Sequence, residues 1–205
     1  NDPRQPQTRA VIAALQRLLP ARPIGGQQKQ PNGREMFLQL ESAIGGAQIE
    51  VLQQRPHHQT EARVEDRPQD HHYDEVYGRE ELKGNLKDSQ MNFWGLYDDD
   101  LLVHVKKKLV ELHESKKPFN LTFTTIDTHG PDGHFSKYCK AHGIKDFPGI
   151  VECTSNQVAE FVQFMRQNGY LKDTNVVILG DHLAMENPVY DKLETVKERH
   201  IFNRF

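Results

Sequence analysis

Two short polar segments hold residues that could do chemistry, and each comes directly after an apolar run. The first segment contains His129, and the second contains the adjacent pair Asp181 and His182. The preceding runs, residues 119–126 and 175–179, are rich in β-branched and aromatic side chains, which is typical of buried strands. In an open α/β sheet, ligands gather beyond the carboxyl ends of the strands. The pattern therefore predicts one site, built from two neighbouring strand ends, for a metal-assisted enzyme.

The pair Asp181 and His182 has the chemistry of a divalent-cation site. Carboxylate oxygen binds Mg²⁺ or Mn²⁺ readily, and imidazole suits Mn²⁺ better than Mg²⁺. An Asp-His dipeptide can also be a hydrogen-bonded loop pair, so that alternative stays open from the residues alone. Its place directly after an apolar run favours the ligand pair.

His129 and Trp94 are further candidates. An imidazole in a turn after a strand can hold a phosphate oxygen or protonate a leaving group. The alternative is a turn histidine capped by Asp127 or Asp132. Trp94 could stack on a sugar or glycerol group, and a place in the core is the simpler alternative.

The chain has two cysteines, Cys139 and Cys153. A disulfide between them would close a short loop and stabilise the fold by roughly 3 kcal/mol in the chain-entropy picture. Two separate buried thiols are the alternative, and their spacing leaves both open. A bridge would indicate an oxidising compartment.

Composition excludes some classes of function. The formal net charge of −3 argues against a protein that coats nucleic acid, because such proteins are strongly basic. No apolar stretch approaches the ~20 residues needed to cross a bilayer. We therefore expect no nucleic-acid partner, and we expect any export signal or membrane segment to lie outside this chain.

The character of the sequence changes near residue 70. Residues 1–69 are rich in Gln, Arg, Pro and His, which predicts an irregular segment, although residues 9–19 could form a helix and residues 35–40 a strand. From residue 70 onward helical and strand patterns alternate. That order favours parallel strands with right-handed crossovers, and therefore an α/β fold.

Two helices are expected in this second part. One starts at an acidic triplet, residues 98–100, where negative charge suits a helix N-terminus, and carries apolar residues on one side as far as Leu112. The other is expected to begin near Ser155 as its N-cap and to end at Gly169. A further strand is expected over residues 199–205.

Residues 70–205 resemble the catalytic domain of the periplasmic phosphoglycerol transferases that modify osmoregulated glucans. These belong, with the lipoteichoic acid synthases, to the sulfatase and alkaline-phosphatase superfamily. The segments that carry the resemblance occur in family order and are residues 73–78, 94–99, 127–133 and 181–185. The resemblance implies a partial alkaline-phosphatase-like α/β/α sandwich with a mainly parallel sheet, preceded by an irregular N-terminal third.

The resemblance also implies roles for single residues. Asp181 and His182 match the metal-binding pair of the family, His129 matches a histidine near the transferred phosphate, and the cysteines fall where relatives carry cysteines, which favours the disulfide. The implied cofactor is Mn²⁺ or Mg²⁺. The implied reaction moves glycerol phosphate from a glycerophospholipid, phosphatidylglycerol, to a glucan hydroxyl through a covalent intermediate. It would take place in the periplasm, with segments outside this chain holding the enzyme at the inner membrane.

The upstream part departs from the family pattern. Relatives place a metal-binding Glu at the end of the first strand and a Thr or Ser nucleophile some tens of residues later. Glu41 is a faint match to the former, and Thr60 lacks a convincing nucleophile context. A shifted reading frame or a replaced N-terminus would explain a first segment outside the family, and we expect little turnover from this polypeptide. The alternatives are another sulfatase-superfamily sulfatase or phosphodiesterase, and a non-catalytic remnant that binds anionic glycans or lipid headgroups.

Overall fold

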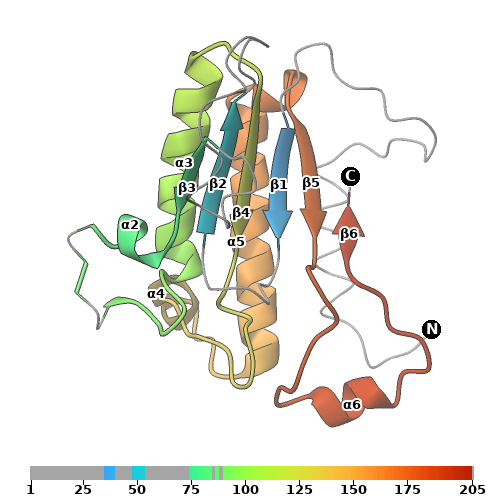
Figure 1. Cartoon of the computed structure of the whole chain (residues 1–205). Helices are drawn as coiled ribbons and strands as arrows, with labels where there is room; N and C mark the ends of the chain where they lie inside the picture. Colours follow the sequence, from blue (N-terminus) through green and yellow to red (C-terminus); the bar gives the residue numbers. More distant parts are fainter. Residues whose placement is uncertain (1–34, 40–47, 54–73, 85, 88–89, 205) are drawn as a thin grey trace, which may run out of the picture.

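A six-stranded sheet with helices packed on it forms the framework of the molecule (Figure 1). The computed structural model describes residues 35–39, 48–53, 74–84, 86–87 and 90–204. In chain order the elements are β1 (Glu35–Gln39), β2 (Gln48–Gln53), β3 (Glu75–Tyr77), α2 (Arg79–Lys83), α3 (Asp98–Glu114), β4 (Phe119–Thr124), α4 (Lys137–Ala141), α5 (Phe147–Gln167), the 3-10 turn η2 (Tyr170–Lys172), β5 (Asn175–Leu179), α6 (Tyr190–Glu194) and β6 (Asn203–Arg204).

The sheet is mixed, with a parallel centre. Its strand order is β3-β2-β4-β1-β5-β6. Among the described strands, β1 runs parallel to both β4 and β5, whereas the pairs β2–β3, β2–β4 and β5–β6 are antiparallel. The expected mainly parallel sheet is therefore seen only in the β4-β1-β5 centre. Residues 40–47 between β1 and β2 are fewer than the dozen or so that a parallel crossover needs, so β2 returns in the opposite direction.

Two long helices, α3 and α5, lie on the same face of the sheet and pack against each other (Figure 1). α3 connects β3 to β4, and α5 connects β4 to β5. Both connections move across the sheet in the same direction. Right-handed crossovers in one direction place their helices on one face, so this layer follows from chain handedness.

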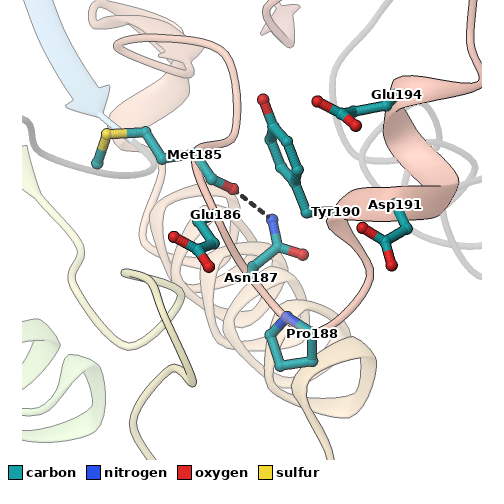
Figure 2. A pocket seen from close by; sticks show the side chains of 7 residues that line it. All are labelled: Met185, Glu186, Asn187, Pro188, Tyr190, Asp191 and Glu194. Carbon is teal, nitrogen blue, oxygen red and sulfur yellow. Dashed lines mark hydrogen bonds between the residues drawn. The ribbon is translucent and has the colours of Figure 1, made fainter.

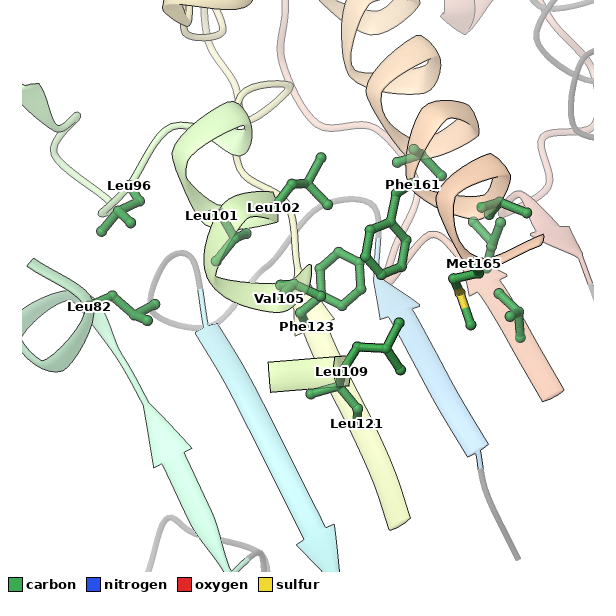
Figure 3. Close-up of a cluster of buried hydrophobic side chains, with 14 of the residues drawn as sticks. Leu82, Leu96, Leu101, Leu102, Val105, Leu109, Leu121, Phe123, Phe161 and Met165 are labelled. Atoms are coloured by element: carbon green, nitrogen blue, oxygen red, sulfur yellow. The ribbon is translucent and has the colours of Figure 1, made fainter. Parts of the chain in front are cut away.

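The core lies between this helical layer and the sheet (Figure 3). Leu101, Val105 and Leu109 recur at helical spacing along α3, and all three are fully buried. Phe123 of β4 meets Phe161 of α5 edge-on, with ring centroids 5.6 Å apart. The predicted apolar face of the first helix is thus the face that covers β4.

The second helix begins earlier than its sequence suggests. Its N-cap is Asp146, whose carboxylate accepts a hydrogen bond from the Gly149 amide at 2.8 Å. The expected N-cap, Ser155, is wrong: its hydroxyl donates to the Val151 carbonyl at 2.7 Å inside the helix. A proline in the first turn reads as a loop signal, although proline is well tolerated there.

The strands that precede the polar segments lie where they were expected. β4 covers most of residues 119–126, and β5 coincides with residues 175–179. Of the described residues in the expected last strand, Asn203–Arg204 form β6 and pair with β5. β1 and β2 come from the first 69 residues, yet both join this sheet, while the helix expected over residues 9–19 lies outside the described residues.

The described residues were also searched for membrane spans. Among them, no helix is both long and apolar enough to cross a bilayer.

Candidate active site

The three parallel strands at the centre of the sheet end at one level. Gln39 of β1 is in register with Thr124 of β4 and with Leu179 of β5. The segments that continue from β4 and β5 therefore leave the sheet at the same edge. β4 and β5 are not neighbours as expected, because β1 lies between them. Glu41, two residues after β1 in the sequence, lies outside the described residues.

The two polar segments touch each other through a glycine. A Cβ atom on Gly130 would lie 2.5 Å from the carbonyl oxygen of Glu186, far inside van der Waals contact. Only a residue without a side chain lets the two backbones approach so closely. The segment after β4, which carries His129, is thereby packed against the segment after β5, which carries Asp181 and His182.

The ring of His129 is held in one orientation. It is 8% exposed, and its Nδ1 lies 2.8 Å from the carbonyl oxygen of Gly130. A carbonyl only accepts hydrogen bonds, so Nδ1 carries the proton and the neutral ring keeps a lone pair on Nε2. The indole of Trp94 lies against the imidazole, with ring centroids 4.4 Å apart. The structure thus brings together two of the residues singled out by sequence.

His182 has the same tautomer beside a carboxylate. Its Nδ1 lies 2.7 Å from the Leu183 carbonyl oxygen, which again leaves the lone pair on Nε2. That Nε2 is buried without a hydrogen-bond partner and lies 3.7 Å from Oδ1 of Asp181. A backbone carbonyl that orients the other ring nitrogen is the usual arrangement behind a metal-ligating imidazole.

The ligand atoms of Asp181 and His182 are of the kinds that bind a divalent cation. Asp181 offers carboxylate oxygen, and His182 offers a buried imidazole nitrogen without a hydrogen-bond partner. Within the described ranges, no cluster of three or more His, Cys, Asp or Glu side chains could hold a metal ion. Two ligands alone hold a cation weakly, so a complete site needs further ligands.

A buried carboxylate that was not singled out from sequence, Asp98, positions the segment after β4. Its Oδ1 accepts hydrogen bonds from the amides of Ile126 at 2.7 Å and Asp127 at 3.2 Å. Its Oδ2 accepts one from the hydroxyl of Thr154 in α5 at 2.9 Å. Burial raises the pKa of Asp98 to about 6, and these hydrogen bonds oppose the rise. Asp98 therefore ties the start of α3 to both the segment after β4 and α5.

The rest of the acidic triplet fixes α4. Asp99 accepts a hydrogen bond from the amide of Tyr138 at 2.9 Å, and Asp100 pairs with Lys137 at 2.9 Å. The triplet was expected to serve the helix dipole. The sequence does contain a signal that Asp98 makes buried contacts, because its helical spacing places it on the same face of α3 as Leu101 and Leu102, and this face is buried.

Asp127 is a second buried carboxyl group in this region. It is fully buried, and neither of its oxygens has a hydrogen-bond partner. Burial and the neighbouring Asp98 carboxylate raise the pKa of Asp127 well above its ordinary value, and the nearby Ser136 hydroxyl offsets this only in part. The two buried carboxyl groups therefore oppose each other's ionisation.

The two cysteines are joined. Cys139 of α4 and Cys153 of α5 form a disulfide with an S–S distance of 2.03 Å. The bridge fastens α4, which carries Tyr138, to the helix that carries Thr154. It therefore connects the partners of two residues in the acidic triplet.

Comparisons with known proteins place the chain among enzymes of one family. The family model described as Sulfatase matches residues 45–200, a range that includes residues 45–69, which were expected to lie outside the family. Phosphoglycerol transferase I of Citrobacter koseri is 37% identical over 140 residues, which cover 64% of this chain and 18% of that protein. The proteins of the same name from Escherichia coli strain 55989 and Escherichia fergusonii are each 36% identical over 140 residues, which again cover 64% of this chain and 18% of the relative. The chain thus spans less than a fifth of the length of these curated relatives. No solved structure matches the chain.

Proposed function

The chain belongs to the sulfatase family, and we propose that it forms part of a metal-dependent phosphoglycerol transferase. The proposed reaction moves glycerol phosphate from phosphatidylglycerol to a hydroxyl group of a periplasmic glucan. The names of the relatives support the reaction class. The single observation that carries the proposal is the buried, unpartnered Nε2 of His182 beside Asp181, in a segment packed against that of His129.

Asp181 and His182 would hold the cation, either Mn²⁺ or Mg²⁺. Glu41 is the proposed third ligand: it follows β1 by two residues in the sequence, and β1 runs between β4 and β5. When bound, the cation would neutralise charge on the phosphoryl group and favour the ionised nucleophile. Substitution of Glu41 by Gln should then weaken Mn²⁺ binding without changing the fold.

His129 would act on the phosphoryl group or on the leaving oxygen. With Nδ1 bound to the Gly130 carbonyl, only Nε2 is left to contact substrate. A protonated Nε2 can donate to a phosphoryl oxygen, or give its proton to the diacylglycerol oxygen as the P–O bond breaks. Trp94 would hold the imidazole plane from one side and present its ring to the glycerol or sugar group.

The disulfide bears on the compartment in which the protein works. The Cys139–Cys153 disulfide favours an oxidising compartment, in keeping with the periplasm. Thr60, a weak candidate nucleophile, lies outside the described residues. We expect little turnover from this chain alone, and we propose that its membrane contact comes from segments outside it.

A chimaera tests the reaction class. The matching 140-residue segment of the Escherichia coli relative would be replaced by the corresponding segment of this chain. The proposal predicts Mn²⁺-dependent release of diacylglycerol from phosphatidylglycerol, no hydrolysis of an aryl sulfate, and loss of release in the variants His129→Gln and Asp181→Asn. Hydrolysis of the aryl sulfate alone would favour a sulfatase. A folded chimaera with neither activity would favour a non-catalytic binding remnant.

A further inference from the structure

A surface cavity of about 790 Å³ opens beside the segment that follows β5 (Figure 2). Residues from the end of that segment and from α6 line it, among them Glu186, Asn187, Tyr190, Asp191 and Glu194. Figure 2 shows the ring of Tyr190 between the segment at Met185 and the side chain of Glu194. The cavity therefore has an aromatic ring on one side and carboxylates around it.

The walls of the cavity are held in place by contacts of their own. The side-chain amide of Asn187 donates to the Met185 carbonyl at 2.7 Å, and its oxygen accepts from the Val189 amide at 3.0 Å. Arg199 donates to the Ala184 carbonyl at 2.7 Å and lies over the ring of Tyr190, 5.5 Å from its centre. A cavity with preformed walls loses less entropy when a ligand binds.

The position of the cavity links it to the candidate active site. Glu186 lines the cavity, and its carbonyl oxygen lies against Gly130, the residue next to His129. A ligand in the cavity would therefore be close to the segment that carries His129. The residues that line the cavity also come shortly after Asp181 and His182 in the sequence.

The charge of the lining decides which reactant fits. Glu186, Asp191 and Glu194 bring three carboxylates to one cavity, none of the described lining residues is basic, and the nearby Arg199 lies over one face of the Tyr190 ring. Like charges brought together across an interface repel each other, so an anionic phosphate group is disfavoured there. A metal ion does not fit either, because no cluster of potential metal ligands occurs in the part of the chain that the structure describes.

We propose that this cavity is the subsite for the acceptor, a neutral gluco-oligosaccharide. Sugar hydroxyl groups donate hydrogen bonds that carboxylates accept, and the apolar face of a sugar ring packs on an aromatic ring such as that of Tyr190. The anionic donor would then occupy the cation side of the site, and the two reactants would meet near His129. This inference rests on the proposed transferase function.

Nuclear magnetic resonance on the isotope-labelled chain tests the subsite, with cellotetraose as the neutral probe and glycerol phosphate as the anionic probe. Cellotetraose should shift the amide signals of residues 185–194 in a saturable way. Glu186→Gln and Glu194→Gln should each weaken binding by about tenfold, the loss expected for one hydrogen bond to a charged group. Glu114→Gln, an exposed substitution at the end of α3, is the matched control and should leave binding unchanged.

The outcomes separate this inference from the proposed function. Shifts elsewhere, no shifts, equal binding by the variants, or stronger shifts of residues 185–194 with glycerol phosphate would each overturn the acceptor subsite. Mn²⁺ added to the same sample should broaden the signals of Asp181 and His182. If the sugar effect is absent and this broadening is present, the subsite is wrong and the metal site stands. If the sugar binds and the broadening is absent, the metal-dependent function is wrong.

Discussion

The indole ring of Trp94 lies against the imidazole of His129, with the ring planes tilted by 36° and the ring centroids 4.4 Å apart. Trp94 sits in a short turn in which its amide donates to the side chain of Asn92 at 2.8 Å. His129 is fixed from the other direction by the Gly130 carbonyl. A residue first considered for stacking on substrate therefore also sets the plane of the candidate catalytic ring.

Replacing Trp94 by Ala should release the ring of His129. The proton signals of that ring should move downfield as the ring current of the indole disappears, and the free energy of unfolding should fall by at least about 0.5–1.5 kcal/mol. Trp94→Phe should cause a smaller change. Phe93→Ala is the matched control, because this neighbouring aromatic residue is 83% exposed. Unchanged His129 signals in Trp94→Ala would contradict the contact.

Asp98→Asn should destabilise the protein and loosen the segment after β4. An amide group offers one acceptor oxygen where the carboxylate serves Ile126, Asp127 and Thr154. We expect a loss of about 1–3 kcal/mol in urea unfolding and faster hydrogen exchange at Ile126 and Asp127. In the control Asp100→Asn, the loss should stay below about 1 kcal/mol, because its ion pair with Lys137 is partly exposed. Equal losses in both variants would refute the role of Asp98.

The Asp98–Asp127 pair should make the protein less stable as pH rises. Both carboxyl groups have raised pKa values in the fold, that of Asp98 to about 6, so the folded state holds more protons than the unfolded state above the ordinary value near 3.8. The contribution of the pair to stability is thus lost between about pH 4 and pH 6 for Asp98, with a slope of up to about 1.4 kcal/mol per pH unit for each proton.

Asp127→Asn is the variant that checks this pH dependence. It removes one of the two titrating groups and the repulsion between them, so the slope measured by urea unfolding from pH 4 to pH 8 should flatten, and stability at neutral pH should rise. A steeper slope, or the same slope as in the unaltered chain, would show that Asp127 is ionised in the folded state.

Reduction of the Cys139–Cys153 disulfide should lower stability by roughly 3 kcal/mol, the loop-closure value for a separation of 14 residues. Because α4 carries the partners of Asp99 and Asp100, its amide signals should lose protection first. The double variant Cys139→Ser with Cys153→Ser should match the reduced protein and should not respond to the reductant. A midpoint in urea that is the same with and without reductant would count against the bridge.

The sequence predicted the parts of the fold that repeat. β5 coincides with its predicted strand. The buried positions of α3 from Leu101 to Leu112 follow the helical spacing from which its apolar face was predicted. Strand direction carries no such pattern, because the alternation of side chains along a strand such as β2 is the same whether the strand runs parallel or antiparallel to its neighbours. The start of α5 was missed because the Pro148 and Gly149 signals for a turn also occur in the first turn of a helix.

The roles of the candidate site residues stay predictions, and the structure adds to how their segments are assembled. The segments after β4 and β5 touch at Gly130 and Glu186, but β1 separates the two strands, and only long-range pairing decides that order. Asp98 was missed because an acidic residue at a helix N-terminus already has a local explanation. Its hydrogen bonds to Ile126 and Thr154 join residues far apart in the chain, which no local pattern reports.

Manganese binding followed by electron paramagnetic resonance tests the central claim most directly. The account predicts that the folded chain binds Mn²⁺ and that Asp181→Asn and His182→Gln each weaken this binding by at least about tenfold. Asp191→Asn, which removes an exposed carboxylate of α6, should leave the affinity unchanged. Equal affinity in Asp181→Asn, or no binding by a well-folded chain, would contradict a metal-dependent site at this edge of the sheet.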